Sequence, residues 1–120
     1  MLKNLLQSAP KTEPLIRIYP NYIAFNAVAT SLLDLKDGDA VSVMQDDRDG
    51  YIYIANNPEA KVAYGIKRKK TTSTLTNAAL CRKLAECFDG NGSYRICVED
   101  SIEFMGHRYY NVFGKKYGKD

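Results

Sequence analysis

Strand-like alternation of apolar and polar residues covers most of the chain, and helical spacing interrupts it twice. Alternation with a period of two is typical of a strand that buries one face. It predicts strands at 15–19, 22–25, 40–45, 51–54, 61–70, 93–99 and 108–113. Apolar residues recur at helical spacing at 27–33 and at 78–88, which predicts two short helices.

The residues that flank the two helical stretches define their ends. Asn26 and Asn77 stand directly before them, and an asparagine there can accept a hydrogen bond from a free amide of the first turn. Gly38 and Gly90 follow them, and glycine readily adopts the positive φ at which many helices end. Each helix is therefore expected to begin at an asparagine cap and to be followed by a glycine turn.

These elements predict an α+β fold, with a mostly antiparallel sheet or small barrel and two short helices. Asp49-Gly50 lies between two strand patterns and is a hairpin signal. A length of 120 residues suits one domain. We expect that domain at 14–113, after a flexible leader at 1–13 and before a basic tail at 114–120.

The second half of the chain repeats the order of the first, which raises the question of an internal duplication. Asn77-Ala78 corresponds to Asn26-Ala27, and Asp89-Gly90 corresponds to Asp37-Gly38. The candidate units are 14–56 and 61–113. A duplication with pseudo-twofold symmetry explains the correspondence. A chance likeness between any two strand–helix–hairpin units explains it too, and the sequence leaves both readings open.

Residues 16–54, about a third of the chain, resemble the swapped-hairpin AbrB-type domain. The resemblance is carried by Tyr22-Ile23-Ala24-Phe25-Asn26, a short helix, the step Leu32-Leu33-x-Leu35-x-x-Gly38-Asp39-x-Val41-x-Val43, and the strand Tyr51-Ile52-Tyr53-Ile54. In that family two copies interlock into a small barrel, usually as a homodimer, and bind DNA. A duplication in 61–113 would place both halves of the barrel in one chain. The basic residues usual on the family's short strand are absent from Tyr22–Asn26, so basic contacts would fall to the second half.

Composition and cysteine content exclude several classes of protein. Apolar residues make up 45% of the chain, which is ordinary for a globular domain. The sequence contains no apolar run of the roughly 20 residues that a membrane helix needs, so we expect no membrane partner and a cytoplasmic location. The three cysteines form no C-x-x-C pair, so we expect free, buried thiols and no structural zinc.

Nothing in the sequence predicts catalysis. His107 is the only histidine, and it is expected in an exposed turn. The acidic turn 46–50 is not a calcium loop, because Gln45 and Asn56 fall where such a loop needs carboxylates. We predict a protein that is not an enzyme and has no cofactor and no metal.

The most distinctive feature is a cluster of basic residues. Residues 61–74 contain five bases and no acid, whereas residues 34–59 contain seven acids and two bases, a net charge of −5. Lysine and arginine neutralise phosphates, and the hydroxyls of Thr71–Thr74 can donate to phosphate oxygens. The predicted phosphate contacts are Lys67, Arg68, Lys69, Lys70, Arg108, Lys115 and Lys116. The plain alternative is a solvated strand end.

Two functions remain as hypotheses. The basic cluster favours a nucleic-acid-binding accessory or regulatory protein, with DNA as the partner. The separation of acidic and basic segments favours instead a protein-interaction or assembly module, which would form a homodimer or bind a protein partner.

Overall fold

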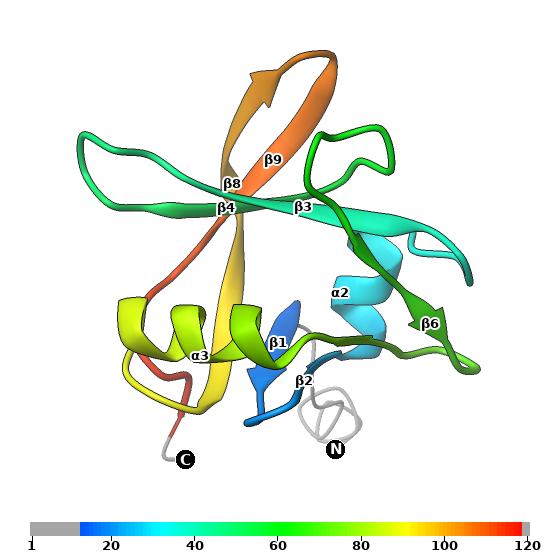
Figure 1. Ribbon diagram of the computed structural model, residues 1–120, viewed down its shortest axis with the longest axis horizontal. Coiled ribbons are helices and arrows are strands. Elements are labelled where there is room, and N and C mark those ends of the chain that lie inside the picture. The colour runs from blue at the N-terminus through cyan, green and yellow to red at the C-terminus, as the bar shows by residue number, and fades with distance from the viewer. Residues whose placement is uncertain (1–12, 119–120) are drawn as a thin grey trace, which may run out of the picture.

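The computed structural model describes residues 13–118. Its first half contains β1 (Leu15–Ile18), β2 (Tyr22–Phe25), α2 (Ala27–Leu32), β3 (Ala40–Gln45) and β4 (Ile52–Asn56). Its second half contains β5 (Tyr64–Gly65), β6 (Lys67–Arg68), β7 (Ser73–Thr76), α3 (Ala78–Cys87), β8 (Gly92–Phe104) and β9 (His107–Val112). The nine strands form one antiparallel sheet with the order β5-β3-β4-β9-β8-β1-β2-β7-β6 (Figure 1).

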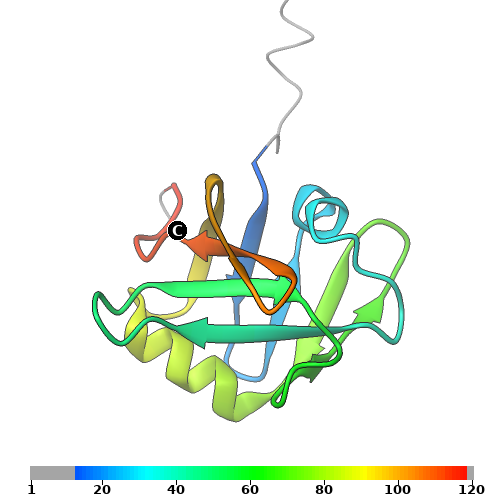
Figure 2. The same cartoon turned by 90° about the horizontal axis from the view of Figure 1, so that it is seen from above.

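The sheet coils back on itself until it is nearly closed. Its two edge strands, β5 and β6, are consecutive in the chain and flank Ile66. The Ile66 N–H donates to the Asp39 carbonyl over 2.7 Å, and the Gly38 N–H donates to the Ile66 carbonyl over 3.1 Å. Figure 2 shows the result from above, with β3 and β4 running across β1 and β2 behind them.

The longest strand, β8, joins the two halves of the sheet. Its first part pairs with β1, and its register with β9 shifts between Cys97 and Ser101. Such a shift leaves residues of one strand unpaired and bends it. Beyond it, β8 and β9 continue as a hairpin that projects from the sheet (Figure 1).

Both helices begin at the predicted asparagine caps. The Asn26 side chain accepts from Ala29 N–H over 2.9 Å, and the Asn77 side chain accepts from Leu80 N–H over 2.9 Å. Gly38 has the predicted positive φ, at +93°. Both helices contact β1 and β2, so they cover the inner surface of that part of the sheet.

The core lies inside the coiled sheet and is built by the inward residues of each strand. In β1 and β2 every second side chain is buried, which places Arg17 and Tyr22 on the outer surface. The largest fully buried apolar side chains of this core are Tyr94, Phe25, Ile16, Ile18, Leu35, Leu75, Ile96 and Val41. A second, smaller buried cluster of Tyr53, Ala55 and Tyr109 lies apart from this core.

The prediction of one strand over 61–70 is wrong. The segment is a loop followed by the two short strands on either side of Ile66. Ile66 is buried, but Val62 is 61% exposed. The strand is interrupted because the sheet nearly closes at this point. The chain pairs first with β3, through β5, and then with β7, through β6, so it cannot form one continuous strand with a single partner.

Three smaller expectations also need correction. No strand is predicted where β7 forms; β7 carries one inward leucine, Leu75, and gains its strand pairing from β2. Cys87 is exposed rather than buried, because the buried stripe of α3 consists of Leu80, Cys81 and Leu84. The alternation predicted for the strand at 93–99 fails at Val98, which is 48% exposed because it lies in the register shift of β8.

The predicted leader 1–13 lies outside the described residues except for Glu13. The described part of the tail, up to Gly118, forms no strand or helix, but Tyr117 N–H donates to the Ser93 carbonyl over 2.8 Å. Within residues 13–118, neither helix is long and apolar enough to cross a membrane.

Candidate nucleic-acid interface

Strand pairing aligns a row of outward side chains across five neighbouring strands. Lys67 pairs with Thr74, Thr74 with Ala24, Ala24 with Arg17, and Arg17 with Ser93. Residues that face each other directly across antiparallel strands point to the same surface of the sheet. Two cations therefore lie in one row, separated by small or hydroxyl-bearing residues.

This row forms the floor of a groove with a volume of about 820 Å³, which we call the basic groove. Its cations are Arg17, Lys67 and Lys69. Its other lining residues are Leu15, Tyr19, Tyr22, Ala24, Phe25, Asn26, Thr72, Ser73, Thr74 and Ser93. No carboxylate is among its described lining residues.

Two tyrosines form the aromatic part of the basic groove. The rings of Tyr19 and Tyr22 stack with their centroids 4.5 Å apart and their planes inclined by 14°. The Arg17 guanidinium lies 5.4 Å from the centroid of the Tyr19 ring, within the range of a cation–π contact. Tyr22 is 37% exposed, so ring surface remains open to a ligand.

Hydrogen bonds hold the frame of the groove in place. Arg17 donates to the Ser93 hydroxyl over 3.2 Å, which connects β1 to β8. The Asn26 side chain accepts from Leu15 N–H over 3.0 Å and donates to the Glu13 carbonyl over 2.9 Å. The turn from β6 to β7 is closed by a 2.8 Å bond from Lys69 N–H to the Thr72 carbonyl. The cations therefore project from a sheet whose geometry is already fixed.

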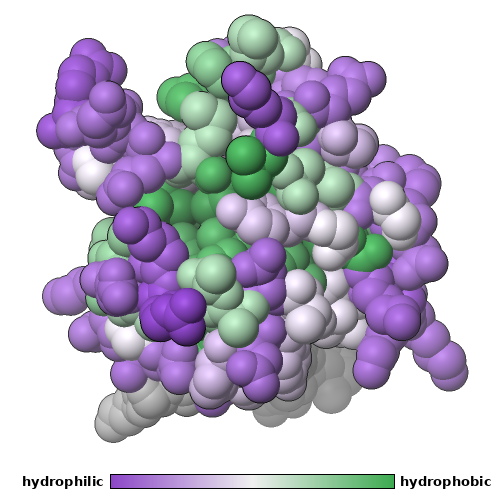
Figure 3. All heavy atoms as spheres, in the orientation of Figure 1, coloured by the Kyte–Doolittle hydropathy of each residue, from purple (hydrophilic) through white to green (hydrophobic). Residues whose placement is uncertain are grey.

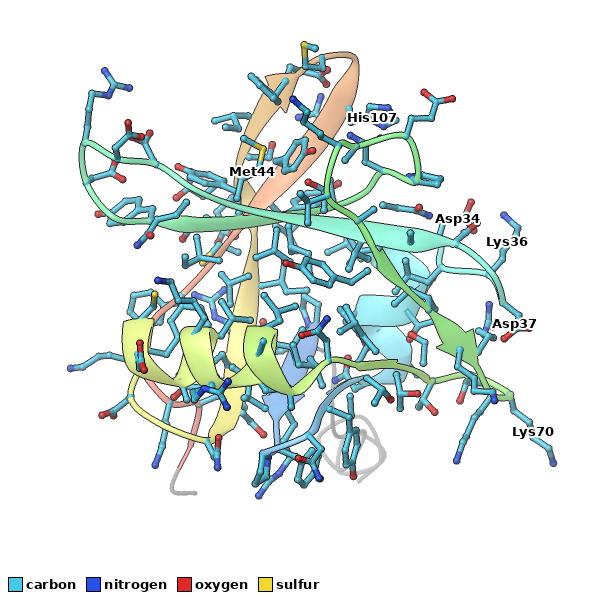
Figure 4. The ribbon with its side chains drawn as sticks, in the orientation of Figure 1. Asp34, Lys36, Asp37, Met44, Lys70 and His107 are labelled. Carbon is cyan, nitrogen blue, oxygen red and sulfur yellow. The ribbon has the colours of Figure 1, made fainter. Side chains whose placement is uncertain are left out.

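The structure separates the seven predicted phosphate contacts. Lys67 and Lys69 line the basic groove. Lys70 lies at the exposed turn between β6 and β7, at the corner labelled in Figure 4. The side chain of Lys116 packs on Gly92, where an added Cβ would meet its Cε at 3.1 Å, and it therefore lies next to Ser93 at the border of the groove. Lys115 is exposed beside it in sequence.

The other two predicted contacts are engaged elsewhere. The Arg68 guanidinium donates to the carbonyls of Leu35 and Lys70 over 2.8 and 3.0 Å, and its backbone N–H donates to Asp37 over 2.9 Å. Arg68 thus braces the β6–β7 turn against the segment after α2. Arg108 lies on the projecting hairpin, where it pairs with Glu103 at 3.0 Å.

Sequence reasoning missed Arg17, Tyr19 and Tyr22 as members of the site. The signal was present in the alternation Leu15-Ile16-Arg17-Ile18-Tyr19, which places an arginine on the polar face of an otherwise apolar strand. What the sequence could not show is the pairing of β2 with β7. That pairing brings Arg17 and Tyr22 to the same surface as Lys67.

Other chemistry is sparse in the part of the chain described. No group of three His, Cys, Asp or Glu side chains there could hold a metal ion. Burial raises the pKa of the Cys81 and Cys97 thiols, which keeps them protonated near neutral pH. His107 is half-buried rather than exposed as predicted, and it lines a separate groove of about 520 Å³.

Comparison with models of protein families, with curated proteins and with solved structures finds no match to this chain.

Proposed function

We propose that this chain is a nucleic-acid-binding protein of accessory or regulatory type, and that the basic groove is its binding surface. The observation that carries the proposal is a groove that brings Arg17, Lys67 and Lys69 together with two stacked tyrosines and has no acid among its described lining residues. The predicted contacts Lys70, Lys115 and Lys116 extend this surface. DNA remains the first ligand to test.

The chemistry of the groove suits a phosphate backbone. Lys67 and Lys69 can each neutralise a phosphate and release a counterion. The hydroxyls of Thr72, Thr74 and Ser93 stand between them and can donate to phosphate oxygens. A solvated strand end explains exposed lysines on β6, but it does not explain why the arginine of β1 and the threonines of β7 lie on the same surface.

The tyrosines support a ligand with accessible bases. An unpaired base stacks on an aromatic side chain regardless of its identity, at about 1–3 kcal/mol per base. Tyr22 offers an exposed ring beside the cation row, two residues from Ala24 along β2. We therefore expect single-stranded DNA to bind more tightly than duplex DNA of the same length.

We also propose that the chain consists of two similar units, with one half of the barrel in each. The supporting observation is a symmetry in the order of the strands. When β1 is exchanged with the β5–β6 segment, β2 with β7, β3 with β8 and β4 with β9, every pair of neighbouring strands becomes another pair of neighbours in the same sheet. Both helices also begin at equivalent asparagine caps. This is what a duplication of the AbrB-type unit within one chain would produce. Co-expressed fragments 1–60 and 61–120 should then assemble, while each fragment alone should stay unfolded.

The binding test uses fluorescence anisotropy of labelled single-stranded and duplex DNA with the full chain. Lys67→Ala/Lys69→Ala should weaken binding by at least tenfold at low salt, since each lost phosphate contact costs on the order of 1 kcal/mol. Tyr22→Ser should weaken single-stranded binding selectively. Arg82→Ala/Lys83→Ala on α3 removes the same charge outside the groove and serves as the matched control.

The outcomes separate the two functional hypotheses. Equal losses in the groove variant and the α3 control would mean that binding follows net charge, and the groove would not be the site. Absence of binding at low salt would remove the nucleic-acid proposal. The assembly module would then be the better account, and it predicts a mass that rises with protein concentration.

A further inference from the structure

A second groove lies on the outer surface of the β3–β4–β9 half of the sheet, and we call it the apolar groove. Its volume is about 520 Å³. One side is formed by the β8–β9 hairpin, another by the loop between β4 and β5, and its base includes β3. Its apolar lining residues are Val43, Met44, Ala60, Val62, Phe104, Met105 and Tyr109.

Large apolar side chains from these separate segments are left open to water here. Met105 is 80% exposed, Val62 61% and Phe104 44%. Figure 3 shows hydrophobic residues gathered around the hairpin and the middle of β3, and Figure 4 shows Met44 directed from β3 toward the hairpin. Single exposed apolar residues are normal, but a concave cluster of them marks a binding site.

The base of the apolar groove is preformed. Tyr109 is 1% exposed, and its hydroxyl accepts a 3.1 Å bond from the buried Asn57 side chain. The Phe104 ring stands edge-on to Tyr109, with centroids 6.0 Å apart. Tyr109, Tyr53 and Ala55 form the small buried cluster beneath. The groove therefore has a packed base with exposed apolar walls.

Carboxylates dominate the border of the apolar groove. Glu59 lines it, and a shallower hollow that shares Met44, Phe104 and Tyr109 with it reaches Asp46 and Asp47. Burial raises the pKa of the Tyr53 hydroxyl, and the charges of Asp100, Asp49 and Asp46 raise it further. Arg48 offsets part of this charge through a 3.6 Å pair with Asp46, Lys61 lines the groove together with Glu59, and Arg108 pairs with Glu103. An apolar ligand with positive charges would fit both the walls and the border.

We propose that the apolar groove binds residues 1–12 of the same chain. This segment contains Leu2, Leu5 and Leu6, at the spacing of one helical face, together with Lys3 and Lys11, and it contains no acid. Its leucines match the exposed walls, and its lysines match the acidic border. The proposal does not depend on nucleic-acid binding.

The chain length permits this contact. Pro14 accepts a hydrogen bond from Ile96 N–H, and Ile96 pairs with Val112 of β9. Strands lie about 5 Å apart and rise about 3.3 Å per residue, so Tyr109 is within about 20 Å of Pro14. Leu6 lies eight residue-to-residue steps before Pro14, and these steps span up to about 26 Å when the chain is extended. The leucines can therefore reach the groove without any rearrangement of the sheet.

The test places a spin label next to the leucines and observes the methionines of the groove. In a Cys87→Ser background, Gln7→Cys carries a nitroxide, and the full chain is labelled with ¹³C at its methionine methyl groups. The methyl signals of Met44 and Met105 should broaden. Leu5→Ser/Leu6→Ser in the same chain should abolish the broadening. Val62→Ser should reduce it, while Val98→Ser, a change at an exposed valine outside the groove lining, should leave it unchanged.

Three results would overturn the proposal. The first is sharp Met44 and Met105 signals in the labelled parent chain. The second is broadening that survives the loss of both leucines, which would mean contact without recognition. The third is broadening in a mixture of spin-labelled chains without ¹³C and ¹³C-labelled chains without the nitroxide, because the occupant would then be a second copy.

Discussion

Removal of the Asn26 side chain should destabilise the protein far more than removal of its counterpart Asn77. Both residues cap a helix, and replacement of an asparagine cap by alanine costs about 1 kcal/mol. Asn26 makes two further hydrogen bonds, from Leu15 N–H and to the Glu13 carbonyl. Each of these contributes about 1 kcal/mol. The expected loss is therefore about 3 kcal/mol for Asn26→Ala and about 1 kcal/mol for Asn77→Ala.

Urea unfolding followed by circular dichroism measures both losses on the same scale. At this size about 1 kcal/mol corresponds to roughly 4 °C in Tm, so a thermal melt should separate the two variants clearly. Asn26→Asp keeps the accepting oxygen and loses only the donor, and it should fall between Asn26→Ala and the parent. Equal losses for the two alanine variants would refute the idea that Asn26 joins β1 to α2 beside the basic groove.

Two other predictions concern titration and reactivity. Hydrogen bonds from Lys36 N–H and the Asn56 side chain lower the pKa of Asp39 below its ordinary value of 3.8. The ionised carboxylate therefore stabilises the folded protein above about pH 4. This stabilisation is lost as the pH falls through the lowered pKa. Asp39→Asn should thus lose about 1 kcal/mol at pH 7 and approach the parent in acid, whereas Asp34→Asn, an exposed control, should change little in urea melts at either pH. Of the three thiols, exposed Cys87 should react with Ellman's reagent in the folded protein at pH 8, while Cys81 and Cys97, whose pKa values burial raises, should react only after denaturation. A fast-reacting thiol that persists in Cys87→Ser would contradict the buried placement of the other two.

Local patterns were sufficient to predict most of the elements. The strands at 22–25 and 40–45 and the asparagine caps of both helices are confirmed. Each depends on residues adjacent in sequence: alternation that buries one face, and a side chain that accepts from the first turn of its own helix. Such signals do not require knowledge of the tertiary structure.

The rest depended on contacts between distant residues. Nothing local distinguishes β7, whose one inward apolar residue is Leu75, from a polar loop, because its strand character comes from pairing with β2. The break at Ile66 results from closure of the sheet. The candidate site depends on distant contacts in the same way. The charge of the sequence was enough to predict Lys67 and Lys69, but Arg17 lies on the same surface only because the strands follow the order β1-β2-β7-β6.

The salt dependence of DNA affinity tests the central claim most directly. Two phosphate contacts from Lys67 and Lys69 predict that log K falls with log salt at a slope of about −1.4 for a single strand. Lys67→Ala/Lys69→Ala should bring the slope close to zero, and Arg82→Ala/Lys83→Ala should leave the parent slope unchanged. A slope near zero in the parent chain, or one that the groove variant shares with the parent, would contradict the account.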